Sequence, residues 1–169
     1  MSKLKNLKVE QFLHDLSSAS ATPGGGATAA LVAAMAASLV QMVAGLTLGK
    51  KGYEKAHEEI KTIKSQAAKA GKTLMALADE DVAAFNGVIA AYKAKDKKRI
   101  RKTLLKATEV PSLVVRLSKE VEKLAARMVV IGNKNAVSDA RSALFFSQSA
   151  AKSAFENVKI NRRTLAGIK

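Results

Sequence analysis

Apolar residues recur every three or four positions along most of the chain, which is the spacing of one face of an α-helix. The pattern predicts helices over about Lys8–Ser17, Ala27–Leu48 and Tyr53–Lys93, then segments on either side of Pro111 and a last one from near Ser138. No run alternates as a strand would. Many small apolar positions also favour packing between subunits. We therefore expect an all-α fold: a single-domain helical bundle over residues 1–169, with long helices, that dimerises.

Several residues mark where these helices begin and end. Asp96 can cap the fourth segment, whereas Pro111 removes a backbone donor and predicts a kink or break. Gly132 is a plausible left-handed cap at the end of the fifth segment. We expect the chain to fray after Asn161.

The helix from Ala27 to Leu48 carries no charge and is long enough to span a bilayer. Its many alanines, together with polar residues such as Thr28 and Gln41, favour a helix buried on all sides within protein. Charged residues interrupt any apolar run before Phe12, so no signal peptide is predicted. We expect a cytoplasmic protein with no membrane contact.

Composition narrows the chemistry. The chain has no cysteine and two histidines, which argues against thiol catalysis and a metal site. The net charge of +15 favours polyanionic partners or simply keeps the protein soluble, and its densest basic cluster lies between Lys93 and Lys102. Aromatic residues make up only 4%, so stacking on nucleic acid is poorly supported and a solvated helical face is favoured.

Three consecutive glycines, Gly24, Gly25 and Gly26, follow Thr22-Pro23 and precede the alanine-rich helix. Such residues can turn with positive φ, and the following helix N-terminus offers unpaired N–H groups to an anion. A plain turn is the equal alternative. No strand precedes the glycines and no Gly-Lys-Ser/Thr follows them, so neither nucleotide-binding loop is predicted.

Asp81 falls on the apolar stripe of the long third helix, together with Leu77 and Phe85. A carboxylate there faces the bundle or a cleft, where burial raises its pKa toward the range useful for acid-base catalysis. A structural ion pair with a lysine is the alternative. Asp79 and Glu80 are expected to face solvent.

A polar segment between two helices contains Asn133, Asn135, Ser138 and Asp139. Its amides, hydroxyl and carboxylate suit a heterocycle with amide and amine edges. Capping by Ser138 or Asp139 explains one of these residues but not all four.

Two further groups allow a structural or a binding role. Asn157 and Asn161 are spaced to share a helical face, where surface polarity is the simpler explanation. Lys50, Lys51 and Tyr53 follow the alanine-rich helix, where cations complement its dipole and can also hold a substrate carboxylate.

These motifs together resemble one family. Thr-Pro-Gly-Gly-Gly from Thr22, Met-Val-Ala-Gly-Leu-Thr from Met42, Lys-Lys-Gly-Tyr from Lys50, Asp81 with Ala-Phe, Gly-Asn-Lys-Asn with Ser-Asp, and Asn-Val-Lys-Ile-Asn to Asn161 are similar to motifs of the formiminotetrahydrofolate cyclodeaminase / methenyltetrahydrofolate cyclohydrolase family, in the same order. The resemblance implies a helical dimer or higher oligomer that binds folate in a cleft near a subunit interface.

The resemblance also implies a chemistry. The methenyl bridge of tetrahydrofolate is formed with loss of ammonia, or is opened by water to 10-formyltetrahydrofolate, without a metal or redox cofactor. Asp81 and Asp139 would act as acid-base or cation-stabilising carboxylates. The pterin would be oriented by Asn133, Asn135, Ser138 and Asn161. The glutamate end would be bound, or the cleft shaped, by Gly24, Gly25, Gly26, Lys50, Lys51 and Tyr53. Thr22 would also belong to the substrate-binding residues.

The chain also departs from the family pattern. Members usually carry a further helical segment after the position of Asn161, so an inactive folate-binding homologue is an alternative. The lack of a preceding transferase domain tilts the expectation toward cyclohydrolase. The basic surplus suggests polyglutamylated folates as substrates. A basic helical nucleic-acid-binding protein is the remaining class, and its affinity would fall steeply with salt.

Overall fold

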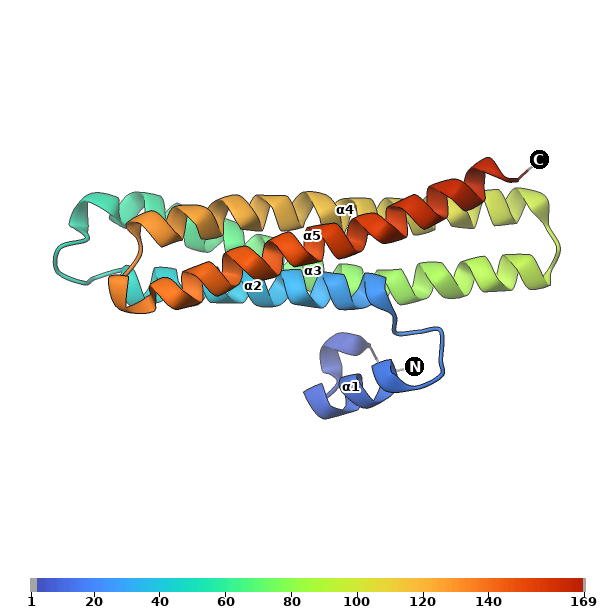
Figure 1. Cartoon of the computed structure of the whole chain (residues 1–169), viewed down its shortest axis with the longest axis horizontal. Coiled ribbons are helices and arrows are strands. Elements are labelled where there is room, and N and C mark those ends of the chain that lie inside the picture. Colours follow the sequence, from blue (N-terminus) through green and yellow to red (C-terminus); the bar gives the residue numbers. More distant parts are fainter. Residues whose placement is uncertain (1–2, 169) are drawn as a thin grey trace.

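The structure, a computed structural model, describes residues 3–168 and consists of helices joined by short turns. Four long helices lie side by side in an elongated bundle (Figure 1): α2 (Gly25–Thr47), α3 (His57–Lys93), α4 (Lys97–Ile131) and α5 (Val137–Ala166). Within this described part no strand is present. The predicted all-α bundle is confirmed.

Shorter helical elements complete the chain. The N-terminal arm, residues 4–17, comprises the 3-10 helix η1 (Leu4–Asn6) and helix α1 (Val9–Ser17), and lies beside the bundle next to α2. Two further 3-10 turns, η2 (Glu54–Ala56) and η3 (Lys134–Ala136), introduce α3 and α5. Both turns lie at one end of the bundle, which we call the loop end; the α3–α4 turn lies at the other, the basic end (Figure 1).

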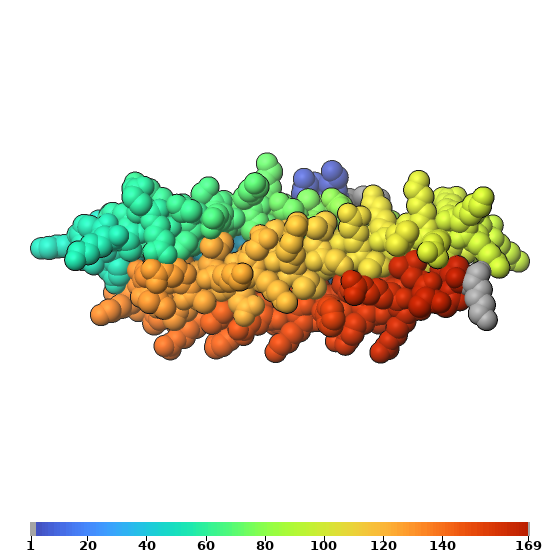
Figure 2. All heavy atoms as spheres, turned by 90° about the horizontal axis from the view of Figure 1, so that it is seen from above, coloured from blue at the N-terminus to red at the C-terminus, as the bar shows by residue number. Residues whose placement is uncertain are grey.

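Small residues set the distances between helices. Alanines line the buried side of α2, and buried Gly71 of α3 faces Ala37, where an added Cβ would come within 3.4 Å of the alanine side chain. Larger side chains such as Ile60 and Leu74 fill the space between α2 and its neighbours. Seen from above, α4 runs between α3 and α5 along the rod (Figure 2). The close approach of neighbouring helices to α2 explains why α2 is so rich in alanine.

One side of α2 is uncovered, contrary to the expectation that the helix is buried all round. Met35, Met42 and Leu46 are each exposed by two-fifths or more. The helix is long and apolar enough to cross a membrane, but half of its most apolar window is buried inside the protein. The periodicity was hard to read because alanine fits both a buried and an exposed face.

Proline does not break α4, which also corrects the sequence prediction. Pro111 is buried within one continuous helix. Proline cannot donate to the carbonyl four residues earlier, that of Ala107. The side-chain amide of Asn161 donates to this carbonyl instead, at 2.7 Å. A neighbouring helix thus replaces the missing hydrogen bond.

Predictions of helix ends had mixed outcomes. Asp96 caps α4 as expected, since its carboxylate accepts from the Arg99 N–H at 3.0 Å. Gly132 is wrong as a left-handed cap, because its φ is −78° and an added Cβ would instead crowd the Met128 carbonyl. Fraying after Asn161 is also wrong, because α5 continues to Ala166.

Candidate active site

Asp81 lies where α3 passes the N-terminus of α2. Its carboxylate accepts a hydrogen bond from the Ala27 N–H and lies directly against Gly26. A Cβ at Gly26 would overlap the carboxylate oxygens, so only glycine permits this approach. The helix N-terminus is therefore an anion site, as the glycines suggested, but the anion is this protein's own side chain.

Burial raises the pKa of Asp81 above its usual value, because desolvation penalises the charged form. The Ala27 N–H opposes the shift without overcoming it. No lysine contributes, so the alternative of a structural ion pair finds no support here. A partly desolvated carboxyl with one backbone partner is suited to exchanging a proton with a ligand.

The three glycines do not adopt positive φ, contrary to the sequence prediction. Gly24 is extended and precedes α2, while Gly25 and Gly26 are its first two residues. Among residues 3–168, positive φ occurs instead at Gly49, Gly52 and Lys95. The requirement for glycine at position 26 comes from the approach of Asp81, which sequence reasoning missed because the two residues are distant in the chain.

Asn157 of α5 lies near the same helix N-terminus. Its side-chain nitrogen is 3.9 Å from the position a Cβ would take on Gly25, and it donates to the Ser153 carbonyl at 3.2 Å. Asn161, one helical turn further on, donates its side-chain amide N–H to the Ala107 carbonyl of α4, as described above. Thr22 belongs to the preceding loop, where its carbonyl accepts from the Ser20 hydroxyl. We call Gly24–Gly26, Asp81 and Asn157 the Asp81 cluster.

A second group of predicted residues lies at the loop end, around Asn133. The Asn133 side chain donates to the Leu46 carbonyl at 3.0 Å and accepts from the Lys50 amine at 3.1 Å. The same oxygen accepts from the Asn135 N–H, which makes Asn133 the cap of η3. Its backbone N–H donates to the buried hydroxyl of Thr47 at 2.9 Å. Asn133 therefore holds the α4–α5 turn against the end of α2, rather than pointing a free amide at a ligand.

Lys50 and Tyr53 keep hydrogen-bond donors available to a ligand at the loop end. The Lys50 ammonium has two further protons to donate, and the Tyr53 hydroxyl accepts from the Lys134 N–H at 3.1 Å while its own proton is free for another acceptor. Lys51, Asn135 and Ser138 are exposed around them. We call Lys50, Tyr53 and Asn133 the Lys50 cluster.

Asp139 is half-buried in the first turn of α5, where the helix dipole favours a carboxylate. Neither it nor Ser138 caps that helix, because the N-cap residue is Ala136. Asp139 belongs to the loop end, six residues after Asn133. The two predicted catalytic carboxylates, Asp81 and Asp139, are thus not brought together within one chain.

The two clusters stand at opposite ends of α2. Asp81 touches Gly26, and Asn133 touches Thr47, so the clusters are separated by about 32 Å at 1.5 Å per residue. Groups that act on one bond must lie within about 3–3.5 Å of the reacting atoms. One chain cannot place both clusters on the same one-carbon bridge.

Two anchoring residues escaped the sequence analysis. Thr47, fully buried, joins the end of α2 to Asn133, and its place at the end of an apolar helix was the available signal. Asp79 was expected to face solvent, yet its carboxylate accepts from the Leu4 N–H at 2.6 Å and ties down the N-terminal arm. No feature of the local sequence indicates that contact.

The fold and site define an all-helical protein with a partly desolvated carboxyl at a helix N-terminus. A family model described as formiminotransferase-cyclodeaminase matches residues 8–167. The chain belongs to this formiminotransferase-cyclodeaminase family, which confirms the resemblance seen in its motifs.

Individual proteins related to folate metabolism by name are also similar to this chain. A methenyltetrahydrofolate cyclohydrolase of Methylorubrum extorquens is 37% identical over 95% of this chain and 81% of its own length. The formimidoyltransferase-cyclodeaminase of Rattus norvegicus is 26% identical, and the chain spans about a third of that protein, 32%. The crystal structure of a formiminotetrahydrofolate cyclodeaminase from Thermotoga maritima superposes with a TM-score of 0.91 at 32% identity, covering 96% of this chain and 82% of the other.

Proposed function

We propose that this protein is a folate one-carbon enzyme that hydrolyses 5,10-methenyltetrahydrofolate to 10-formyltetrahydrofolate. The observation that carries the proposal is the desolvated Asp81 carboxyl at the N-terminus of α2, in a chain 37% identical to a methenyltetrahydrofolate cyclohydrolase. Cyclodeamination of 5-formimidoyltetrahydrofolate is the second candidate, favoured by the close structural match to a cyclodeaminase.

Asp81 supplies the proton transfers in either reaction. As a carboxylate it takes a proton from the attacking group, which is water in hydrolysis and N10 in cyclodeamination, or stabilises the cationic methenyl bridge. As a carboxylic acid it protonates the departing nitrogen, which is N5 in hydrolysis and the nitrogen that leaves as ammonia in cyclodeamination. Its raised pKa keeps both forms accessible closer to neutral pH than for an exposed aspartate. Lys50 and Tyr53 bind the anionic or carbonyl groups of the substrate. No metal or redox cofactor is required by these steps.

The separation of the two clusters supports a homodimer with shared sites. If two copies pack with their α2 helices antiparallel about a two-fold axis, the Asp81 cluster of one copy approaches the Lys50 cluster of its partner. The exposed side of α2 suits this packing, because no charged residue occurs from Gly25 to Thr47 although the chain carries +15. Asp139 would then join Asp81 from the partner subunit.

The basic end suggests a preference for polyglutamylated folates. The turn between α3 and α4 lies about 18 Å beyond Asp81 along α3, at 1.5 Å per residue. Between Lys93 and Lys102 the sequence has seven cations and one acid, Asp96, which is engaged as a helix cap. Such a field attracts the carboxylates of a polyglutamate tail. The KM for a pentaglutamyl substrate should be lower than for the monoglutamate at low salt and converge with it at high salt; equal values at low salt would contradict this.

The primary experiment follows the loss of methenyltetrahydrofolate absorbance, corrected for spontaneous hydrolysis. Wild-type protein should accelerate the loss, and Asp81→Asn should not. Ammonia release from 5-formimidoyltetrahydrofolate, measured in parallel, identifies the deaminase. Absence of both activities in a folded protein that still binds folate would leave the inactive-homologue alternative, and wild-type turnover by Asp81→Asn would refute the role of this carboxyl.

Subunit complementation tests the shared site. Asp81→Asn and Lys50→Ala should each be inactive alone. After mixing and exchange, half the dimers combine the two variants and each of those has one intact site of two, so about a quarter of wild-type activity should return. If both variants are inactive and mixing restores nothing, the clusters do not cooperate across an interface.

A further inference from the structure

A stripe of large side chains continues along α3 from Asp81. Phe85, Ile89 and Tyr92 follow it at spacings of four, four and three residues, so all four residues lie on one face of the helix. The three side chains are 37%, 40% and 45% exposed. Single exposed apolar residues need no explanation, but a continuous exposed apolar surface marks a place where something binds. We call Phe85, Ile89 and Tyr92 the apolar track.

The track is uncovered because α2 begins beside Asp81 and runs away from it. The Asp81 carboxylate lies against Gly26, the second residue of α2. From there α2 runs toward the loop end, whereas α3 continues in the opposite direction to Lys93 (Figure 1). Because the track shares its helical face with Asp81, it faces the line along which a longer α2 would extend. The position at which α2 starts therefore leaves the track open.

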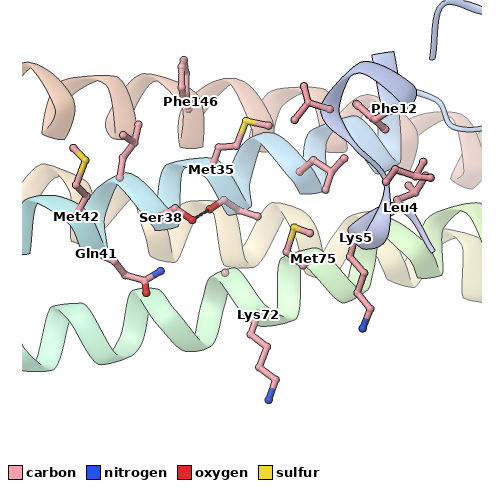
Figure 3. A pocket seen from close by; sticks show the side chains of 16 residues that line it. Leu4, Lys5, Phe12, Met35, Ser38, Gln41, Met42, Lys72, Met75 and Phe146 are labelled. Carbon is pink, nitrogen blue, oxygen red and sulfur yellow. Dashed lines mark hydrogen bonds between the residues drawn. The ribbon is translucent and has the colours of Figure 1, made fainter. Parts of the chain in front are cut away.

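The track is separate from the other uncovered apolar surface of the molecule. A groove of about 850 Å³ lies beside the N-terminal arm, where Met35 and Met42 of α2 line it (Figure 3). The last α3 residue that lines this groove is Met75, which precedes Asp81. The groove thus belongs to the side of α2 that the proposed dimer would bury, and the track does not.

The track connects two places of different chemistry. At its start is the partly desolvated carboxyl of Asp81. At its other end, the cations of the basic end begin at Lys93, the residue after Tyr92. Asp81 and Tyr92 are about 16 Å apart along the helix axis, at 1.5 Å per residue. A ligand that follows the track therefore meets a proton-exchanging group, then an aromatic and aliphatic surface, and then a positive field.

We propose that the apolar track binds the p-aminobenzoyl ring of the folate substrate and leads its glutamate to the basic end. In folate the ring is bonded directly to N10 and the glutamate follows through an amide. The reacting bridge, the ring and the carboxylates thus occur in the same order as Asp81, the track and the cations. Phe85 stacks against the ring, and Ile89 extends the apolar surface. The Tyr92 hydroxyl, which makes no hydrogen bond to another of the described residues, donates to the glutamate.

Charge favours the substrate as the occupant over a second helix. The basic end adjoins the track, so an anionic ligand is attracted there and another copy of this chain, at +15, is repelled. Phe85 is only one helical turn, about 6 Å, from Asp81 along the axis. A helix laid on the track would therefore also close the approach to the carboxyl. The inference rests on the proposed function and adds the residues that recognise the unreacting part of the substrate.

Steady-state kinetics of the full chain test the contact with the ring. Phe85→Ala should raise the KM for 5,10-methenyltetrahydrofolate by about 10-fold and leave kcat within about twofold, because a contact with an unreacting group is made equally in the ground state and the transition state. The KM for 5,10-methenyltetrahydropteroate, which has the ring but no glutamate, should rise by the same factor. Tyr92→Phe should raise the KM of the glutamate-bearing substrate alone.

The matched control is Leu105→Ala, which should change neither constant. Leu105 is 55% exposed and lies on α4, on the same helical face as Arg101 and Glu109 and outside the track. Circular dichroism verifies that each variant retains its helices. If Phe85→Ala loses them, Ile89→Ala repeats the test at the next position of the track.

Each outcome decides the proposal. A KM raised for both substrates in Phe85→Ala, with Leu105→Ala unchanged, supports the track. An unchanged KM, or a fall in kcat at constant KM, overturns it, as does a change in the sedimentation of Phe85→Ala that places Phe85 in a subunit contact. If the wild type has neither folate activity, the proposed function fails, and calorimetric binding of 5-formyltetrahydrofolate tests the track by itself. Weaker binding by Phe85→Ala then supports the track, whereas equal binding or none overturns it.

Discussion

Replacing Gly26 by alanine should move Asp81, and its effect can be compared with the same change one residue earlier. The added Cβ at position 26 overlaps the Asp81 carboxylate, which must shift away from the Ala27 N–H. At Gly25, the nearest atom to the added Cβ is the Asn157 side-chain nitrogen at 3.9 Å, an ordinary contact. The two substitutions lie one position apart, but only the one at Gly26 places its Cβ against the Asp81 carboxyl.

The magnitude follows from two opposing effects. Forcing an added methyl against the Asp81 carboxylate costs about 1–3 kcal/mol, the scale of overpacking, whereas the lost Ala27 hydrogen bond is offset by renewed solvation of the carboxylate, because desolvation outweighs that bond in the folded protein. Glycine to alanine in a helix contributes about 0.5–1 kcal/mol in the other direction. We expect Gly26→Ala to destabilise by about 1 kcal/mol, and Gly25→Ala to be neutral or stabilising by up to about 1 kcal/mol. Turnover should fall by about 10²-fold in Gly26→Ala, the scale of a 1 Å misplacement.

Urea unfolding at pH 7 and methenyltetrahydrofolate hydrolysis measure the two effects. The decisive comparison adds Asp81→Ala. Without the carboxylate, Gly26→Ala should become neutral or stabilising, because the clash is gone. If Gly26→Ala destabilises equally in both backgrounds, or leaves turnover unchanged, then contact with Asp81 is not the reason for glycine at this position.

Two further substitutions test individual contacts. Asp81→Asn should raise the free energy of unfolding at pH values above the ordinary aspartate pKa of 3.8 and have little effect below it. The reason is that the pKa of Asp81 is raised in the folded protein, so the wild type loses stability as the carboxyl ionises with rising pH. Urea unfolding measured from pH 3 to 8 would contradict this if the wild type became more stable relative to the variant as pH rose. Asn161→Ala should destabilise by about 1–3 kcal/mol by leaving the Ala107 carbonyl unpaired, and the loss should shrink when Pro111→Ala restores a backbone donor; an equal loss in both backgrounds would exclude that compensation.

Much of the fold could be predicted because long helices repeat their signal many times. The apolar stripe of α3 placed Asp81 on the inner side, and its raised pKa agrees with that position. The continuity of α4 could not be predicted, since it depends on Asn161 reaching across from α5 to Ala107. The sequence correctly indicated that Pro111 removes a backbone hydrogen bond, but the side chain that replaces this bond lies 50 residues further along the chain.

The site was predicted as a set of residues and not as an arrangement. Asn133 has the amide expected of a ligand-binding residue, yet Leu46, Lys50 and Asn135 occupy its side chain. Gly26 looked like a turn residue and proves to be a contact residue. Residue type indicates which hydrogen bonds are possible, whereas the partners that use them come from elements distant in the sequence.

The length of α2 links this packing to function. A helix advances 1.5 Å and turns about 100° with each residue, so its 23 residues fix both the separation of the two clusters and the direction of its uncovered stripe. Alanines on the inner side hold α3 and Asp81 in register, while Met35 and Met42 on the outer side form the exposed surface that the proposed dimer would bury. Inserting one residue would break both registers together. The proposed site shared between antiparallel copies would therefore constrain α2 more strictly than stability alone, because each end would have to meet the opposite end of an identical helix.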